Sequence, residues 1–197
     1  MITMGRIVYL CGKSSSGKDT IFKELLKRDT LGLRTIVPYT TRPVRAGETS
    51  GVEYFFTDEE GFQKLLAEGK IIEHREYHTV HGLWRYFTVD DGQIDLSAGD
   101  YIVIGTLEGY EKMKAYFGEG VLCPILIELD DGVRLQRALD RERRQENPRY
   151  EEMCRRFLAD SLDFSEERIA AAGVGRRFYN DDLEKCLKEV EEHIKGG

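Results

Sequence analysis

The sequence predicts an α/β fold in three layers, a doubly wound parallel sheet with helices on both faces. Short apolar runs rich in β-branched residues alternate along the chain with charged segments of helical spacing. Two of the runs, Tyr101 to Leu107 and Val121 to Leu129, are apolar throughout, which is typical of strands buried on both faces of a parallel sheet. In such a sheet we expect ligands at the carboxyl ends of the strands.

The remaining elements follow from residue spacing and from signals at their ends. Arg6 to Cys11 reads as a short strand, and Ile21 to Lys27 has the spacing of the helix that follows it. Thr57 and Glu60 have the separation of a capping box, and Gly69 marks the end of the helix that they begin. Further helices are expected over 107–117, 132–144, 150–172 and 182–194, with a last strand over 176–179.

Composition limits the classes of protein to which the chain can belong. Its 197 residues suffice for a single domain with a core, and 29 basic against 36 acidic residues give a net charge of -7. We expect no nucleic-acid partner, because such binding needs a basic field. No apolar stretch reaches the length of a membrane span, and the four cysteines lack the spacing of a zinc site or a disulfide framework. These features predict a cytoplasmic protein without a membrane partner.

A glycine-rich loop stands between the first strand and the first helix. It reads G-K-S-S-S-G-K-D-T and comprises Gly12, Lys13, Ser14, Ser15, Ser16, Gly17, Lys18, Asp19 and Thr20. In the pattern G-x-x-x-x-G-K-S/T, backbone N–H groups and the start of a helix converge on phosphates, and the lysine reaches the outer phosphates. The alternative is a turn that only links strand to helix. The flanking strand and helix favour an ATP site of the P-loop kinase type, with Lys18 as a catalytic residue.

Asp19 stands where a Ser or Thr hydroxyl usually contacts the Mg²⁺ that accompanies the nucleotide. A carboxylate can ligate Mg²⁺ directly or through water, so Asp19 is the expected metal ligand. A carboxylate can also repel the phosphates, and in that case the hydroxyl of Thr20 takes its place.

The stretch from Thr40 to Phe56 has the residues of an anion clamp. It carries Arg42, Arg45 and Tyr54 among glycines, and the planar fork of arginine matches phosphate oxygens in a bidentate way. The alternative is a solvated loop in which the arginines pair with Glu48 and a second nearby glutamate.

This stretch resembles guanylate kinases, whose acceptor-site signature T-T-R-x-x-R-x-G-E-x-x-G-x-x-Y-x-F is matched at every fixed position from Thr40 to Phe56. The resemblance runs over nearly the whole chain, through Gly69-Lys70-Ile71-Ile72-Glu73 to Asn180-Asp181-Asp182-Leu183. It implies a single P-loop kinase domain over 1–197 with inserted GMP-binding and lid subdomains. The core would comprise about 1–36, 99–135 and 157–197, the acceptor-binding insertion about 37–98, and the lid about 136–156.

By this resemblance the chain is expected to phosphorylate GMP with ATP and Mg²⁺, as a monomer or a homodimer. Arg42, Arg45 and Tyr54 would hold the GMP phosphate and Glu48 would brace the arginines. Glu73 would accept hydrogen bonds from guanine, which suits the two adjacent donors on the Watson–Crick edge of the base. Without the resemblance, Glu73 would read as an exposed strand residue. Asn180 opens the stretch that looks like the family's N-D-D-L, and we expect it on the ATP side.

Four arginines recur at helical spacing in the segment 132–144. Arg134, Arg137, Arg141 and Arg144 share one face of the expected helix, and like charges so placed are mutually unfavourable unless anions intervene. Arg137 and Arg141 resemble the arginines that enter the family's lid, and Arg156 resembles the one that leaves it. We expect these three to close over the transferred phosphoryl group. The alternative is a solvated face.

Three stretches differ from the family's pattern, and they lie where specificity resides. Pro38 stands near the position of a small hydroxyl residue, Ile104-Gly105-Thr106 replaces an acidic D-x-D, and Thr79-Val80-His81-Gly82 replaces N-Y-Y-G. We expect Thr106 to contact the base through its hydroxyl and His81 to take the place of a phosphate-binding tyrosine. The alternative for His81 is a surface position on a strand.

Two further functions compete with GMP phosphorylation. A kinase of another phosphorylated small molecule, such as ribose 1,5-bisphosphate, has a loop that looks like G-K-D-S and so shares Asp19, but it lacks the arginine-rich signature. A non-catalytic guanylate kinase-like binding module would keep the fold and lose ATP binding, which the intact Gly17 and Lys18 oppose.

Replacing Lys18 with Ala should abolish ATP-dependent turnover, because the ammonium group that reaches the outer phosphates is removed. The measurement is ADP release in a coupled assay. Unchanged turnover in this variant would contradict the assignment of the loop.

Overall fold

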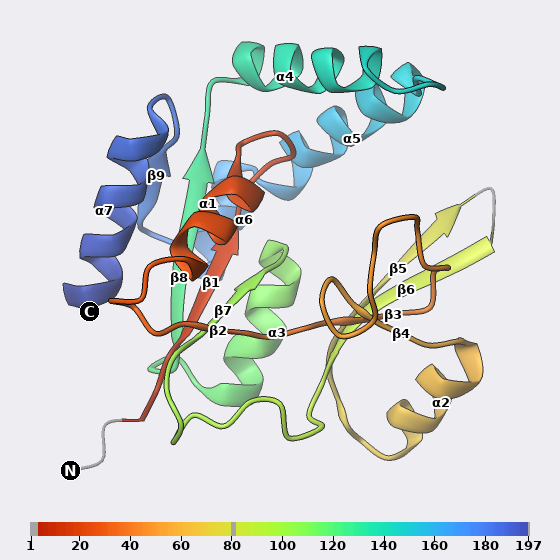
Figure 1. Ribbon diagram of the computed structural model, residues 1–197, viewed down its shortest axis with the longest axis vertical. Helices are drawn as coiled ribbons and strands as arrows, with labels where there is room; N and C mark the ends of the chain where they lie inside the picture. Colours follow the sequence, from red (N-terminus) through yellow and green to blue (C-terminus); the bar gives the residue numbers. More distant parts are fainter. Residues whose placement is uncertain (1–3, 80–81, 197) are drawn as a thin grey trace.

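Five parallel strands form the central sheet of the computed structural model, which describes residues 4–79 and 82–196. Their order is β2-β7-β1-β8-β9 (Figure 1). The strands are β1 (Ile7–Cys11), β2 (Arg34–Thr35), β7 (Tyr101–Ile104), β8 (Leu122–Glu128) and β9 (Arg177–Tyr179). All five residues of β1 are buried because the strand pairs with β7 on one side and β8 on the other. The glycine-rich loop 12–20, called the phosphate loop from here on for its expected ligand, therefore leaves from the centre of the sheet.

Helices cover both faces of this sheet, so the predicted three-layer α/β architecture is confirmed. Val8 and Leu10 of β1 point to one face, where they pack with α1 (Lys18–Leu26) and α7 (Leu183–Gly196). Tyr9 and its neighbours of the same parity point to the other face, toward α3 (Leu107–Phe117) and α6 (Glu166–Ala172). The alternation of side chains along a strand thus divides the core into two apolar clusters.

A second sheet lies beside the first, with the order β4-β3-β6-β5 (Figure 1). Its strands are β3 (Tyr39–Thr40), β4 (Phe55–Phe56), β5 (Ile71–Thr79) and β6 (Gly82–Val89). Helix α2 (Glu59–Ala67) covers one face, because its Phe62 packs against Phe87 with ring centroids 4.9 Å apart. The antiparallel register opposes Glu73 to Thr88 and Arg75 to Tyr86. With a period of two, these four side chains share the face opposite to α2.

Helices α4 (Asp131–Arg143) and α5 (Tyr150–Asp163) form a helical pair that extends beyond the carboxyl end of β8 (Figure 1). The sequence predicted one helix over 150–172, but the structure breaks it between α5 and α6. Ser165 caps α6 by accepting a hydrogen bond from the Arg168 backbone N–H at 3.4 Å. A Ser at an N-cap satisfies one of the free N–H groups of a new helix, which is why the chain can turn there.

The start of α2 and the end of β7 also differ from the boundaries that the sequence predicted. Asp58, rather than Thr57, caps α2, and its Oδ1 accepts from the backbone N–H of Gly61 at 2.8 Å. The strand expected over 101–107 ends at Ile104, because Thr106 caps α3 by accepting from the Gly109 N–H at 3.1 Å. Local side-chain capping decides both ends.

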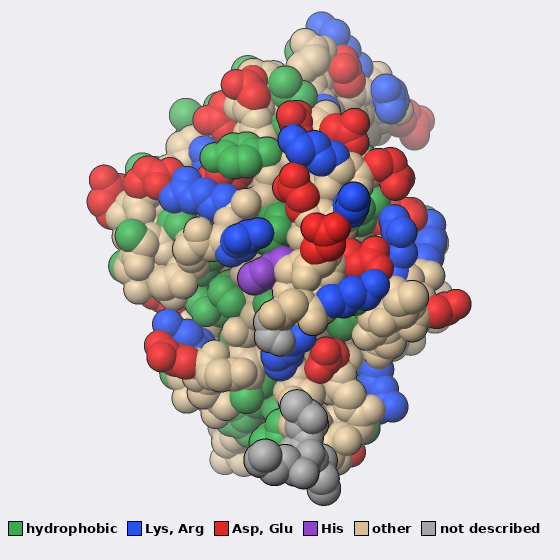
Figure 2. All heavy atoms as spheres, turned by 90° about the vertical axis from the view of Figure 1, so that its left-hand side faces the viewer, with side chains coloured by type: hydrophobic (Ala, Val, Ile, Leu, Met, Phe, Trp, Pro, Cys, Tyr) green, Lys and Arg blue, Asp and Glu red, His purple; other side chains and the backbone are tan. Residues whose placement is uncertain are grey.

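The face that includes α7 mixes acidic and basic side chains (Figure 2). On this helix Lys195 pairs with Glu191 at 2.6 Å, and Arg28 of the chain following α1 reaches the same glutamate at 3.7 Å. Among the helices in the described part of the chain, none is both long and apolar enough to cross a membrane.

Asp58→Ala should lower the free energy of unfolding by about 1 kcal/mol, because the first turn of α2 loses its side-chain acceptor. Urea denaturation measures the change. Thr57→Ala is the comparison that separates the two candidate caps: a larger loss in Thr57→Ala than in Asp58→Ala would contradict the assignment.

Candidate active site

Two glycines of the phosphate loop lie where a side chain would collide with neighbouring atoms. A Cβ on Gly12 would lie 2.4 Å from the carbonyl oxygen of Ile127, and a Cβ on Gly17 would lie 2.2 Å from Nδ2 of Asn180. Both glycines also have positive φ, at 148° and 89°. Asn180 is buried and donates to the carbonyl oxygen of Ser16 at 2.7 Å. Asn180, which was expected on the ATP side, thus holds the backbone of the loop.

Lys18 begins helix α1, so the loop's amides and the positive end of the helix lie together. The Nζ of Lys18 donates to the carbonyl oxygen of Lys13 at 3.4 Å, which places the ammonium group over the loop. Ser15 has a φ of 62°, a left-handed conformation that brings successive N–H groups of the loop to one side. Asp19 and Thr20 are exposed on the first turn of α1.

Arg134 and Asp160 join the loop to the helical pair α4–α5, and sequence reasoning missed this junction. The Arg134 side chain is 1% exposed; its Nε donates to the Ser14 carbonyl oxygen at 2.9 Å and its Nη2 to Oδ2 of Asp160 at 2.9 Å. Asp160 in turn accepts from the Ser14 N–H at 2.8 Å, and Asp131 also pairs with Arg134. The partners lie 26 and 120 residues from Arg134 along the chain, so no local spacing could have revealed them.

The four arginines of α4 and its end therefore do not form one equivalent stripe, as their spacing suggested. Arg134 is buried, whereas Arg137, Arg141 and Arg144 are exposed. A Cβ on Gly17 would lie 3.6 Å from Nη1 of Arg137, so this guanidinium reaches the end of the phosphate loop. Repulsion along the helix is reduced because one of the four, Arg134, pairs with the carboxylates of Asp160 and Asp131.

On the acceptor side, Arg42 and Glu48 form a bidentate pair. Nη1 and Nη2 of Arg42 donate to the two carboxylate oxygens of Glu48 at 2.7 and 2.6 Å, and the Arg42 side chain is 3% exposed. The hydrogen bonds from Arg42 hold the pKa of Glu48 at about 2. Glu48 also accepts from the Arg45 backbone N–H at 2.8 Å, and the guanidinium of Arg42 lies 5.0 Å from the ring centroid of Tyr54. The structure thus brings four predicted acceptor residues together.

Glu73 lies at a different point, in the corner between β5, β6 and the start of α3. Its side chain is 3% exposed, and Oε1 accepts from the Thr88 hydroxyl at 2.8 Å. Nε of Arg75 lies 3.3 Å from the other carboxylate oxygen. The hydroxyl oxygen of Thr106 is occupied as the cap of α3, close to the same corner. His81 lies outside the described residues.

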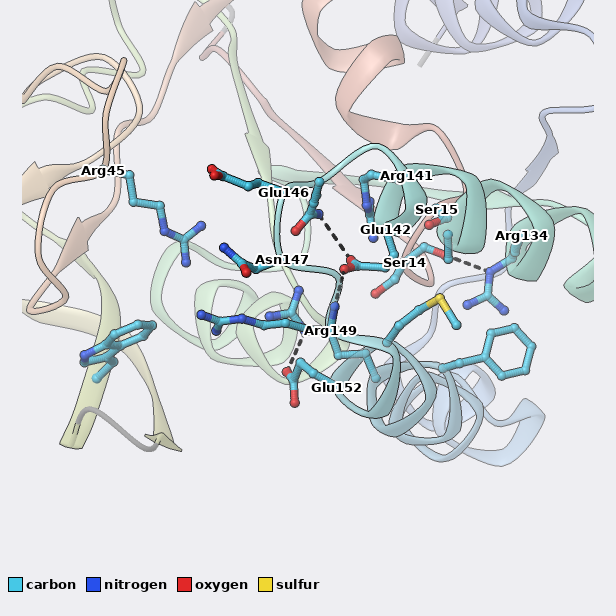
Figure 3. Close-up of a pocket in the computed structure, with 16 residues that line it drawn as sticks. Ser14, Ser15, Arg45, Arg134, Arg141, Glu142, Glu146, Asn147, Arg149 and Glu152 are labelled. Carbon is cyan, nitrogen blue, oxygen red and sulfur yellow. Dashed lines mark hydrogen bonds and ion pairs between the residues drawn. The ribbon is translucent and has the colours of Figure 1, made fainter.

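A cavity of about 550 Å³ lies between the phosphate loop, the α4–α5 pair and the second sheet, β4-β3-β6-β5. Ser14 and Ser15 line it from the loop, and Arg141 and Arg156 line it from the helical pair. Arg45 lines it from the connection between β3 and β4, residues 41–54, which we call the acceptor segment. In Figure 3 the side chain of Arg45 points across the cavity toward the turn between α4 and α5. Arginines from α4, from α5 and from the acceptor segment therefore face one cavity, which suits a ligand with several phosphates.

Glu142 has a structural role at this turn. It is 8% exposed and accepts from the Arg149 backbone N–H at 3.0 Å and from the Gln145 side chain at 3.3 Å (Figure 3). Arg156, by contrast, is 57% exposed and pairs with Glu152 at 2.8 Å. An exposed pair of this kind contributes little to stability, so Arg156 can exchange Glu152 for a phosphate at small cost.

Replacing Glu48 with Gln should destabilise the protein in a pH-dependent way. The pKa of Glu48 lies at about 2, below its ordinary 4.5, so the stabilisation is fully present above about pH 4.5 and is lost as the pH falls toward 2. We expect the difference in unfolding free energy between wild type and Glu48→Gln to be constant from pH 5 to 7 and to shrink at lower pH, in urea titrations. Glu60→Gln, at an exposed position of α2, is the control. A difference that stays constant down to about pH 3 would contradict the pairing.

Comparison with known proteins places the chain among nucleotide kinases. The guanylate kinase family model matches residues 4–83. A guanylate kinase of Nostoc sp. is 30% identical over 199 residues, covering 98% of this chain and 90% of the relative. One of Thiobacillus denitrificans is 30% identical over 189 residues, covering 94% and 83%. The crystal structure of guanylate kinase from Anaplasma phagocytophilum superposes with a TM-score of 0.69 at 19% identity, over 98% of this chain and 86% of that one, which shows the shared fold. With this extent of similarity along its length, the chain belongs to the guanylate kinase family.

Proposed function

We propose that this chain transfers the terminal phosphoryl group of ATP to the phosphate of GMP. The observation that carries the proposal is the cavity in which Arg45 of the acceptor segment faces Arg141 and Arg156 of the helical pair, with the phosphate loop beside them. ATP would bind on the loop and the acceptor phosphate beside Arg42 and Arg45. Curated relatives of similar length are named guanylate kinases, which supports this choice of acceptor.

The chemistry needs positive charge more than a base. The acceptor is already an anionic oxygen, so the protein must overcome repulsion between two anions, align the groups in line and stabilise charge on the transferred phosphoryl group. We assign Lys18 and the loop amides to the ATP phosphates and Arg42, Arg45 and Tyr54 to the acceptor phosphate. Glu48 fixes the two arginines, because it bonds one by its side chain and the other by its backbone.

The segment 136–156 would act as a lid and 37–98 as the acceptor-binding insertion. Arg137 already lies beside Gly17, while Arg141 and Arg156 line the cavity from the helical pair. Closing this pair over the cavity would bring the three guanidinium groups onto the phosphates and exclude water, whose attack would waste ATP.

The residues at the start of α1 fit a Mg²⁺ ion. Asp19 and Thr20 offer a carboxylate and a hydroxyl, the hard oxygen donors that Mg²⁺ prefers, and both are exposed beside Lys18. Within the described ranges no group of three or more His, Cys, Asp or Glu side chains is placed to hold a metal. This agrees with the usual binding of Mg²⁺ by one or two protein ligands, substrate phosphates and water. When bound, the ion would neutralise charge on the phosphates of ATP.

GMP should stimulate ADP release from ATP in a coupled assay with a panel of nucleoside monophosphates.

Arg45→Met should raise the KM for GMP by about tenfold or more, because one charge-assisted contact to the acceptor phosphate is lost. Arg168→Met is the matched control, since Arg168 lies on α6 and pairs with Asp163. Purine and pyrimidine monophosphates that all fail to stimulate ADP release would contradict the proposed function.

A further inference from the structure

The turn between α4 and α5 ends in an arginine, Arg149, to which the family resemblance gives no role. It lines the same cavity as Arg141 and Arg156 of the helical pair. In Figure 3 it lies across this cavity from Arg45. Arg149 is therefore an additional cation in the space where the phosphates are expected.

The backbone of Arg149 is held on both sides. Its N–H donates to Oε2 of Glu142 at 3.0 Å, and its carbonyl oxygen accepts from the N–H of Met153 at 3.0 Å. Glu142 is buried and also accepts from the Gln145 side chain, so its carboxylate is occupied within the turn. Pro148 precedes Arg149, and the proline ring restricts the backbone there. The point from which the Arg149 side chain leaves the turn is therefore fixed.

The guanidinium group of Arg149, by contrast, is unpaired. It makes no ion pair or hydrogen bond with any residue in the ranges 4–79 and 82–196, and the residue is exposed. Glu152 on the first turn of α5 already accepts hydrogen bonds from Arg155 at 2.7 and 2.8 Å and from Arg156 at 2.8 Å. Those bonds, chiefly the ones from Arg155, lower the pKa of Glu152 to about 2. Arg149 can thus donate to a ligand without first giving up a partner.

The charge around the cavity favours an anion. Of the described residues, five arginines and three glutamates line it. Two of the glutamates are occupied by the bonds given above, and the third, Glu146, is exposed and forms no ion pair in the described part of the chain. Arg45, Arg141 and Arg149 form no ion pair within that part either. A cleft lined by an excess of one charge concentrates ions of the opposite charge, here a phosphate.

We propose that Arg149 binds the phosphate of the acceptor nucleotide from the side of the helical pair, opposite Arg45. The phosphates of ATP are expected on the loop, where Lys18 and Arg137 lie, so the space between Arg45 and Arg149 is left for the acceptor phosphate. A guanidinium fork suits this group because it offers two parallel donors to phosphate oxygens. The inference rests on the proposed function and deepens it, since it gives the closing segment its own contact to the acceptor.

The test is the variant Arg149→Met, assayed by ADP release with GMP varied at saturating ATP and with ATP varied at saturating GMP. We expect the KM for GMP to rise by about tenfold or more, because a charge-assisted hydrogen bond to the phosphate is lost. The KM for ATP should stay near wild type. Arg149→Lys, which keeps the charge and loses the fork, should recover part of the loss.

Arg144→Met is the matched control. Arg144 ends α4 in the same helical pair and is exposed, but it is not among the residues that line the cavity. This variant makes the same change in net charge and should leave both KM values near wild type. Arg149→Gln should match Arg149→Met, which shows that the effect does not come from an apolar side chain at an exposed position. Urea unfolding should be unchanged in these variants, because the bonds to Glu142 and Met153 use only the backbone of Arg149.

The outcomes distinguish the two proposals. A KM for GMP in Arg149→Met that equals the value in Arg144→Met would overturn the role of Arg149 and leave GMP phosphorylation intact. A rise in the KM for ATP that equals or exceeds the rise for GMP would also overturn it, because the contact would then lie on the donor side. If GMP does not stimulate ADP release in the wild type, GMP phosphorylation itself is wrong, and the inference falls with it.

Discussion

The rest of the proposed site depends on the fixed position of the phosphate loop, because its backbone amides are expected to bind the phosphates of ATP. The loop leaves the buried central strand β1, and Gly12 lies against Ile127 of β8. Asn180 holds it through the Ser16 carbonyl oxygen, and the pair Arg134–Asp160 holds both polar groups of the Ser14 backbone. A loop whose own carbonyl and amide groups are fixed in this way needs no reorganisation when charge develops on a phosphoryl group.

The arginines of the site fall into two physical groups. Arg42 and Arg134 are nearly inaccessible; Arg42 pairs with Glu48, and Arg134 pairs with Asp160 and Asp131. Removing Glu48 or Asp160 would leave a buried charge without a close partner. Arg141 and Arg156 are exposed on the helical pair, and the pair of Arg156 with Glu152 is in contact with water. The first group maintains the geometry of the two binding surfaces. The second group is free to change partners, as a segment that closes over a ligand must be.

The residues proposed for phosphate binding and those expected to recognise the base lie in separate parts of this fold. The phosphate side uses positive charge from three elements around one cavity. The corner where the base is expected holds the pair of Glu73 and Arg75, which has no net charge, near the neutral residues Gly105 and Thr106. The charge of a phosphate requires cations whatever base is attached, whereas the pattern of donors and acceptors on the base can be matched by several sets of side chains. Departures from the family's pattern can therefore concentrate on the base side.

Much of the molecule could be predicted from the sequence, because it depends on local patterns. Apolar runs gave the buried strands, and the α/β layers followed from their alternation with helices. The spacing of Gly12, Gly17 and Lys18 predicted the phosphate loop. The stretch from Thr40 to Phe56 identified the family, which the comparisons confirm. Contacts between distant segments were decided only by the tertiary structure. Arg134 looked like one of four equivalent arginines until its partners from the loop and from α5 were brought to it. Glu73 reads from the sequence as an exposed strand residue, and only the packing of β5 against β6 and the first turn of α3 shows that it is buried. Local periodicity determines which face of an element a side chain occupies, but the charge that it meets there depends on which other element packs against that face.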